Sequence, residues 1–323
     1  MEVDVKKIYH LPDKKALLVS FIDRHKAGSP TDPSIFWVHL KPFEIAQLFE
    51  EEQGLKVSNM AVKGVLKELG YKYRTLSKQL ATGHYAQRNE QFQIIFDLVC
   101  LMSLQSPIIS IDCKKKERIG HLYRAGKCYM TDRQKTYDHD YDHLAKGKVI
   151  PHGIYDLLAN MGYLTIGNSS ETAEFVIDNL RWWWTEHGIH RYPDAKNLLI
   201  LCDAGGANSY RHHIFKIQLQ QLSKELGISF IVAHYPPYAS KWNPIEHRLF
   251  CHVHQAMQGV MFDNYEIVKE LCEKTKTKTD LKVVVRIHLK EYKTGMKADK
   301  NDIIESRIEY HNSIPKLNYR IHP

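Results

Sequence analysis

The chain has 323 residues, which is enough for about two domains with a sizeable buried core. Hydrophobic residues make up 43% and charged residues 25%, an ordinary balance for a soluble globular protein. Lys plus Arg number 45 against 37 acids, so the formal net charge of +8 favours a polyanionic partner without proving one. The longest apolar stretch, 94–104, is too short to span a bilayer, and the first seven residues do not form a signal peptide, so we expect a cytoplasmic protein.

The first elements in chain order are a loop and a pair of helices. Gly and Pro mark the loop over 27–34, and Pro42 opens the first helix. A turn at 53–55 follows, and Ser58 can cap the second helix. This is the layout of a helix-turn-helix over about 42–70, although most such pairs are packing units. The candidate DNA-binding side chains here are Lys63, Lys67, Lys72 and Arg74.

From about residue 107 the pattern alternates between strands and helices. Strands are predicted at 107–112, 119–124, 163–166, 197–202 and 228–233. Helices are predicted at 84–104, 171–187, around 215–226 and from 244 onward. The strand at 119–124 is expected to pair with the one at 107–112. Such alternation indicates an α/β sheet covered by helices on both faces.

Three acids lie at the boundaries of these elements. Asp112 and Asp203 each end a buried strand, and Glu246 lies in the first turn of a helix. Such positions collect functional side chains, and three carboxylates there could hold two divalent cations roughly 3.5–4 Å apart for phosphodiester chemistry. Each acid also has a structural interpretation: aspartates are common turn residues, and Asn243 with Glu246 fits a capping box. Spacing alone favours the structural interpretation for each acid.

Other side chains near these elements have two interpretations as well. Trp182 falls off the apolar stripe of its helix, so it could stack on an unpaired base, although a packing contact is favoured. Basic residues near the acids are candidates for phosphate contacts or for a solvated face: Lys114, Lys115, Lys116 and Lys241.

Three segments occur in a fixed order that resembles a known family. They are Ser110–Glu117, Leu201–Ser209 and His234–Phe250. This order resembles the Rhodopirellula-type DDE transposase family of bacterial insertion sequences, a distant relative of the mariner-like transposases. Further similar segments are Gly147–Asp156, Arg181–Trp184, Thr277–Val283 and Asn318–Pro323. The resemblance runs from about residue 17 to the end, with a shorter stretch before the helix pair than is usual in that family.

The resemblance implies an α/β, ribonuclease-H-like fold: a mixed sheet flanked by helices and preceded by a helix-turn-helix region. It implies that Asp112, Asp203 and Glu246 are the catalytic and metal-binding triad, with Asp203 shared by both ions. Mg²⁺ would be the cofactor, with Mn²⁺ as a substitute. The reaction would be hydrolysis at a transposon end, followed by attack of the freed 3′-hydroxyl on target DNA. The partners would be transposon-end and target DNA and further copies of the chain, as a homodimer or higher assembly associated with the nucleoid.

We therefore expect three regions along the chain. Residues 1–104 would form a helical DNA-binding region, 105–265 the catalytic domain, and 266–323 a C-terminal extension packed on that core. Two other functions remain open. One is a truncated, non-catalytic DNA-binding relic, and the other is a metal-dependent nuclease without strand transfer.

Overall fold

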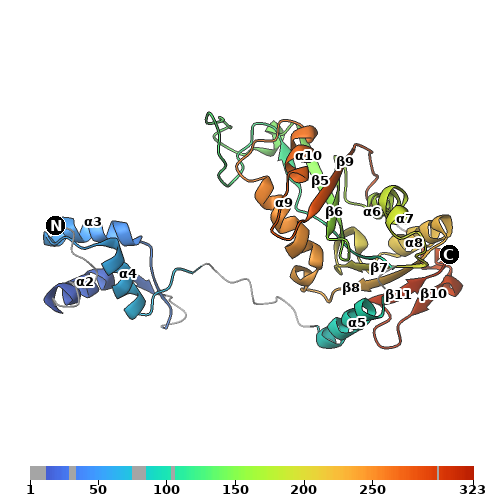
Figure 1. Cartoon of the computed structure of the whole chain (residues 1–323), viewed down its shortest axis with the longest axis horizontal. Coiled ribbons are helices and arrows are strands. Elements are labelled where there is room, and N and C mark those ends of the chain that lie inside the picture. Colours follow the sequence, from blue (N-terminus) through green and yellow to red (C-terminus); the bar gives the residue numbers. More distant parts are fainter. Residues whose placement is uncertain (1–11, 29–33, 75–84, 103–105, 297) are drawn as a thin grey trace. The chain divides into compact units, whose positions relative to one another are not determined.

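The computed structural model describes residues 12–28, 34–74, 85–102, 106–296 and 298–323. The chain divides into two compact units, Met1–Leu80 and Ala81–Pro323, each with its own core (Figure 1). No helix within these described residues is long and apolar enough to cross a membrane.

The first unit is a small helical domain with a short hairpin. Its elements are α2 (Pro12–Arg24), β1 (Lys26–Gly28), β2 (Phe36–Val38), α3 (Pro42–Gln53) and α4 (Asn59–Glu68). The Ser58 hydroxyl accepts a hydrogen bond from the Ala61 amide at 3.2 Å, which confirms the predicted helix cap. The loop predicted over 27–34 begins later than expected, because Lys26–Gly28 pair with β2. Residues 29–33 of that loop lie outside the described residues.

The second unit is built on one large mixed sheet. Its strands, within the described residues, run in the order β10-β11-β8-β7-β3-β5-β6-β9, and β4 pairs with β5. The strands are β3 (Ile108–Cys113), β4 (Glu117–Ile119), β5 (Gly147–Asp156), β6 (Met161–Gly167), β7 (Asn197–Cys202), β8 (Ser229–His234), β9 (Lys282–His288), β10 (Ile308–Tyr310) and β11 (Asn318–Ile321). The helices are α5 (Arg88–Leu101), α6 (Ala173–Trp183), α7 (Ile189–Arg191), α8 (His213–Leu226), α9 (Cys251–Ala256) and α10 (Tyr265–Glu273).

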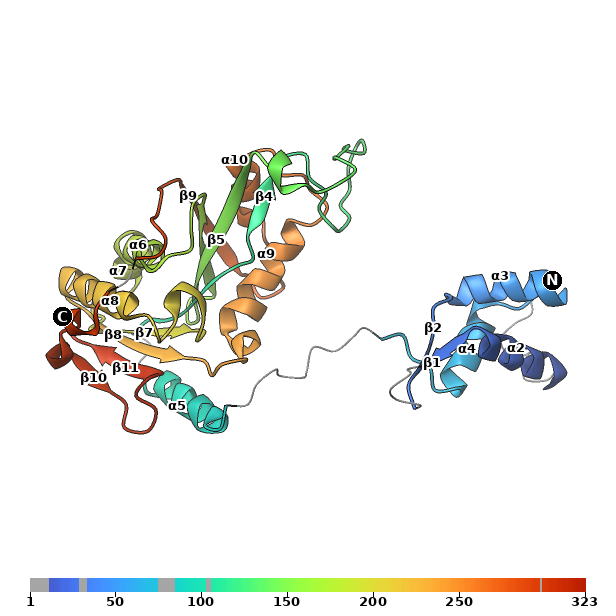
Figure 2. The ribbon, with the colours of Figure 1, turned by 180° about the vertical axis from the view of Figure 1, so that it is seen from behind.

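Helices cover both faces of this sheet, as predicted (Figures 1 and 2). Alternate side chains of a strand point to opposite faces, so each strand contributes to two cores. Ile109 and Ile111 of β3 join the core beneath α6 and α8. Ile108 of the same strand packs instead against α5. The helices that follow Asn243 cover the same face as α5, over β5, β6 and β9. The mixed α/β class is therefore confirmed.

Three local predictions differ from the structure. The strand predicted at 119–124 is the short β4, which ends at Ile119 and pairs with β5 rather than with β3. The long strand β5 itself was not predicted, and it is the strand that pairs with β3. The extension predicted to pack on the core, 266–323, contributes the strands β9, β10 and β11 to the sheet itself, at its two outer sides.

Candidate active site

Asp112 and Asp203 lie side by side at the carboxyl ends of the neighbouring strands β3 and β7. β3 and β7 are parallel, and their last register pair is Ile111 with Cys202. One further step along both strands brings Asp112 next to Asp203, since neighbouring strands are roughly 4.8 Å apart. Both acids alternate with the residues of their strands that pack under α6 and α8, so both point toward the opposite face.

A buried histidine holds the backbone at Asp203. His234, at the end of β8, is fully buried, and its Nδ1 lies 3.0 Å from the Asp203 carbonyl oxygen. Burial lowers the pKa of His234 to about 4, so the ring is neutral at pH 7 and Nδ1–H donates to that carbonyl. The carboxylate of Asp203 accepts a hydrogen bond from the Gly205 amide. His234 therefore orients the turn that presents Asp203.

Glu246 comes from a helix that is tied to β3 by a fully buried asparagine. Asn243 Nδ2 donates to the Ile111 carbonyl at 3.1 Å, and Asn243 Oδ1 accepts from the Ser110 hydroxyl. The same hydroxyl accepts from the Ile245 amide at 3.0 Å. The π-helical segment Glu246–Phe250 follows, without a side-chain cap. The capping-box interpretation is therefore wrong: the Asn243 side chain anchors the helix, and Glu246 is free to face Asp112.

The carboxyl groups of these acids interact directly. The carboxyl groups of Asp112 and Glu246 lie close enough for each to affect the pKa of the other. Burial, and next the charge of Asp203, raise the pKa of Asp112 to about 8. Burial also raises the pKa of Asp203 and of Glu246. The structure thus brings together all three acids that the sequence singled out, in a setting that resists three negative charges.

A divalent cation would relieve this repulsion. The donors are carboxylate oxygens, which suit hard ions such as Mg²⁺. Among the described residues, no three His, Cys, Asp or Glu side chains are already arranged to hold a metal ion. The donor chemistry of Asp112, Asp203 and Glu246 therefore fits a divalent cation, while ligation would require their side chains to move closer together.

The predicted DNA-contacting residues fall into different environments. Lys114 pairs with Glu117 at 2.7 Å and is largely buried, so it is an internal ion pair rather than an open phosphate ligand. The other candidates in this unit, Lys115, Lys116 and Lys241, are exposed. The remaining four lie in or after α4 of the first unit and are exposed: Lys63, Lys67, Lys72 and Arg74.

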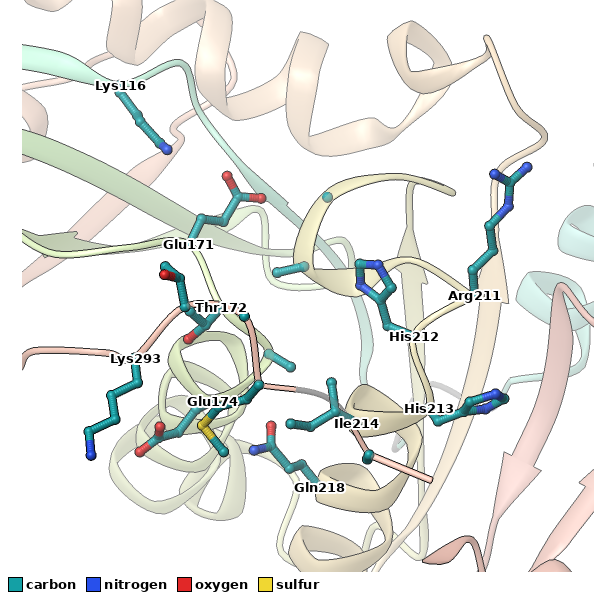
Figure 3. Close-up of a pocket in the computed structure, with 17 residues that line it drawn as sticks. Lys116, Glu171, Thr172, Glu174, Arg211, His212, His213, Ile214, Gln218 and Lys293 are labelled. Atoms are coloured by element: carbon teal, nitrogen blue, oxygen red, sulfur yellow. The ribbon is translucent and has the colours of Figure 1, made fainter. Parts of the chain in front are cut away.

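A pocket of about 760 Å³ lies next to Glu171 and Gly206 (Figure 3). Lys116 and Glu171 lie on one side of it, and Arg211 and His212 on the other. Lys116 and Arg211 are exposed, and neither forms an ion pair with a carboxylate in the described part of the chain. The pocket is therefore lined by basic and acidic side chains together.

Sequence reasoning missed two residues of this site, His234 and Glu171. His234 begins the segment His234–Phe250 that resembles the family. Its position at the end of an apolar strand could have indicated that it belongs to the site. Glu171 was placed inside a helix, but α6 starts at Ala173 and Thr172 is its cap. Trp182 matches the favoured packing interpretation, because its ring lies 4.4 Å from the Arg286 guanidinium and contacts Tyr163.

A mixed sheet flanked by helices, with carboxylates where β3 and β7 end, fits the ribonuclease-H-like fold that the sequence resemblance implied. More particularly, the chain belongs to the family described as Rhodopirellula transposase DDE domain, whose model matches residues 17–323. The sequence resemblance is thereby confirmed, and the chain is a transposase of the DDE class by family. A comparison with curated proteins gives no match.

Solved structures of a mariner transposase resemble the chain at a low level. The "Mos1 transposase paired-end complex with left transposon end" is 17% identical, with a TM-score of 0.44 over 79% of this chain and 68% of that one. The "mariner Mos1 paired end complex with Mg" is 17% identical, with a TM-score of 0.46 over 76% and 74%. Likeness of this degree supports no argument about mechanism, which depends on the site itself.

Proposed function

We propose that the protein is a Mg²⁺-dependent DNA transposase whose catalytic and metal-binding residues are Asp112, Asp203 and Glu246. The observation that carries the proposal is the coupling of these three carboxyl groups. They come from three separate elements, and each has a raised pKa because burial and the neighbouring acids disfavour its charge. Family membership supplies the reaction class, and the carboxylate oxygens of the three acids are the donors that hard divalent cations prefer.

The reaction would proceed by two phosphodiester exchanges. Water attacks a phosphorus at the transposon end, a P–O bond forms to the water oxygen, and the 3′ oxygen leaves as a hydroxyl. That hydroxyl then attacks a target phosphodiester and displaces its 3′ oxygen. Divalent ions bound by the triad would polarise the attacking and leaving oxygens. Asp203 would be one of the residues that hold these ions, and His234 fixes its backbone through the Asp203 carbonyl.

The DNA would be held by basic side chains of both units. In the second unit Lys115, Lys116 and Lys241 are exposed near the acids, and Arg211 faces the adjacent pocket. These side chains would contact phosphates on either side of the cut. We further propose that two or more copies act together on paired ends, which size-exclusion chromatography with light scattering would detect on DNA.

The test is a nicking and strand-transfer assay on labelled duplexes that carry the ends of the element encoding the protein. We expect nicked and joined products with Mg²⁺ or Mn²⁺ and none with EDTA. Asp203→Asn should abolish both products while DNA affinity is retained, because it removes a metal ligand and no phosphate contact.

Two results would contradict the proposal. DNA binding without any metal-dependent nicking by the wild-type protein would favour the non-catalytic relic. Nicking without recovery of joined products would favour a nuclease that uses the same acids.

A further inference from the structure

A fourth carboxylate, Glu171, lies at the same edge of the sheet as the triad. β6 runs parallel to β3, because each of them pairs antiparallel with β5. The carboxyl ends of β3, β6 and β7 therefore lie at the same end of the sheet. Glu171 follows the end of β6 by four residues. The Thr172 hydroxyl caps α6 by accepting from the Phe175 amide at 3.2 Å, so Glu171 lies outside the helix.

The Glu171 side chain lies near the residues that follow both β3 and β7. On one side is Cys113, the last residue of β3. On the other side, Glu171 Oε1 lies 2.8 Å from the point where a Cβ on Gly206 would be, so only glycine fits there without displacing the carboxylate. Gly206 also has a φ of 60°, in the left-handed region. Glu171 is thus held against the turn that carries Asp203.

Within the described residues Glu171 forms no ion pair, whereas Glu174, three residues on, pairs with Lys290 at 2.9 Å. An unpaired carboxylate next to other acids is unfavourable unless a cation joins the group.

We propose that Glu171 is a fourth oxygen ligand of the divalent-cation site, next to Asp112 and Asp203. The inference rests on the proposed function of the triad. Four carboxylates balance the charge of two divalent ions, whereas three leave an excess positive charge. Hard cations take six or more oxygen ligands, so a fourth protein carboxylate has a place in their coordination.

The experiment measures Mn²⁺ binding to the full-length, DNA-free protein, using the electron paramagnetic resonance signal of free Mn²⁺. The wild type is compared with Glu171→Gln, Glu171→Asp and Asp203→Asn. Glu186→Gln is the matched control, because Glu186 is an exposed glutamate beyond the other end of α6. We expect Glu171→Gln to weaken Mn²⁺ binding by about tenfold or more. Glu171→Asp should regain part of it, and the control should bind like the wild type.

A second readout separates ligation from folding. In EDTA, Glu171→Gln should have a melting temperature at or above that of the wild type, because it removes repulsion among the acids. Added Mn²⁺ should then raise its melting temperature by less than it raises that of the wild type.

Each outcome bears on one of the two proposals. If Asp203→Asn loses Mn²⁺ and Glu171→Gln binds it like the wild type, Glu171 is not a ligand, and the triad still stands. If Glu171→Gln melts lower in EDTA and Glu171→Asp regains no Mn²⁺ binding, Glu171 is a structural residue and the inference is wrong. If the wild type binds no Mn²⁺, or Asp203→Asn binds as well as it does, the proposed metal site itself fails.

Discussion

At the scale of single residues, burial decides which side chains can carry charge. Asp112 and Asp203 are half-buried and adjacent, so their charged forms are disfavoured until a cation is present. Histidines in the same sheet are kept neutral by the same cause. His234 uses its neutral ring to hold the Asp203 carbonyl, whereas both ring nitrogens of His152 on β5 have no hydrogen-bond partner. The buried ring of His152 therefore affects the stability of the protein in acid.

His152 should make the protein sensitive to acid. Burial, and next the charge of Arg286, lower the pKa of His152 to about 3 in the folded state, against roughly 6.5 when unfolded. The unfolded chain therefore binds the proton first, so stability is complete above pH 6.5 and falls as the pH drops toward 3. His152→Leu should flatten this fall by up to about 1.4 kcal/mol per pH unit.

The measurement is urea unfolding of the metal-free protein at several pH values between 7 and 4. His190→Gln is the control, because His190 is exposed and should leave the slope unchanged. If the free energy of unfolding changes with pH in the same way for the wild type and for His152→Leu, His152 is not the group that takes up the proton.

At the scale of elements, the helix of Glu246 is positioned by two contacts with the sheet. One is the polar link from Ser110 and Asn243, and the other is close packing on glycines. A Cβ on Gly153 would lie 2.6 Å from the Phe250 ring and 2.8 Å from Ile245. A Cβ on Gly162 of β6 would lie 2.4 Å from Leu249. These glycines let the helix approach the strands closely enough for Glu246 to reach Asp112.

Ser110→Ala should weaken the polar link. It leaves Asn243 Oδ1 and the Ile245 amide without a partner in a buried place, which costs about 1–3 kcal/mol of stability. Because the Ser110 hydroxyl contacts no DNA or metal, metal-dependent nicking should fall through displacement of Glu246 alone. The two readouts are urea unfolding and the nicking assay. Unchanged nicking in a clearly destabilised protein would mean that the link does not position Glu246.

Gly153→Ala should disturb the close packing instead. Overpacking of a core typically costs 1–3 kcal/mol, and the added methyl group meets a ring that has no room to move. Phe250→Leu removes the atoms that the methyl group would meet, so the double variant should regain part of the stability lost by Gly153→Ala alone. A double-mutant cycle measured by urea unfolding gives this coupling. If the stability losses of Gly153→Ala and Phe250→Leu simply add in the double variant, the strain does not arise at Phe250.

The sequence predicted the parts of the fold that depend on local patterns. The apolar run 197–202 followed by Asp203 gave β7 correctly, and Ser58 gave the start of α4. β5 was missed because Gly147, Pro151 and Gly153 interrupt its pattern. Gly153 is needed there only because Phe250 packs against it, which is a contact between residues far apart in the sequence.

The candidate site was predicted to a similar extent. The choice of the three acids follows from strand ends and from the resemblance. The structure places Asp112 beside Asp203 and Glu246 near Asp112, while their catalytic and metal-binding role stays a prediction. Glu171 could not be found in this way, because the helical pattern was extended through it. Thr172 as a cap was the local signal for the correct start of the helix. That Glu171 lies near Asp203 depends on β6 running parallel to β3, which no local pattern reveals.

At the scale of the whole molecule, the predicted DNA-binding helices and the proposed catalytic acids lie in separate compact units. The acids lie in the unit Ala81–Pro323, and the predicted helix-turn-helix lies in the unit Met1–Leu80. α4 exposes Lys63 and Lys67 on the side away from its buried residues Val62 and Val65. If α4 contacts DNA, these lysines neutralise phosphates and release counterions.

The double substitution Lys63→Gln and Lys67→Gln in the full chain should therefore weaken DNA binding and make it less dependent on salt. The slope of log K against log salt should become shallower by about 2, at roughly 0.9 per lost phosphate contact. Lys269→Gln with Lys274→Gln is the control for net charge, since these lysines pair with Glu273 and Glu270 on α10. Fluorescence anisotropy titrations at about ten KCl concentrations, from roughly 50 mM to about 300 mM, would measure both slopes. Equal slopes for the two double variants would mean that α4 is a packing element, and that DNA is held by the catalytic unit alone.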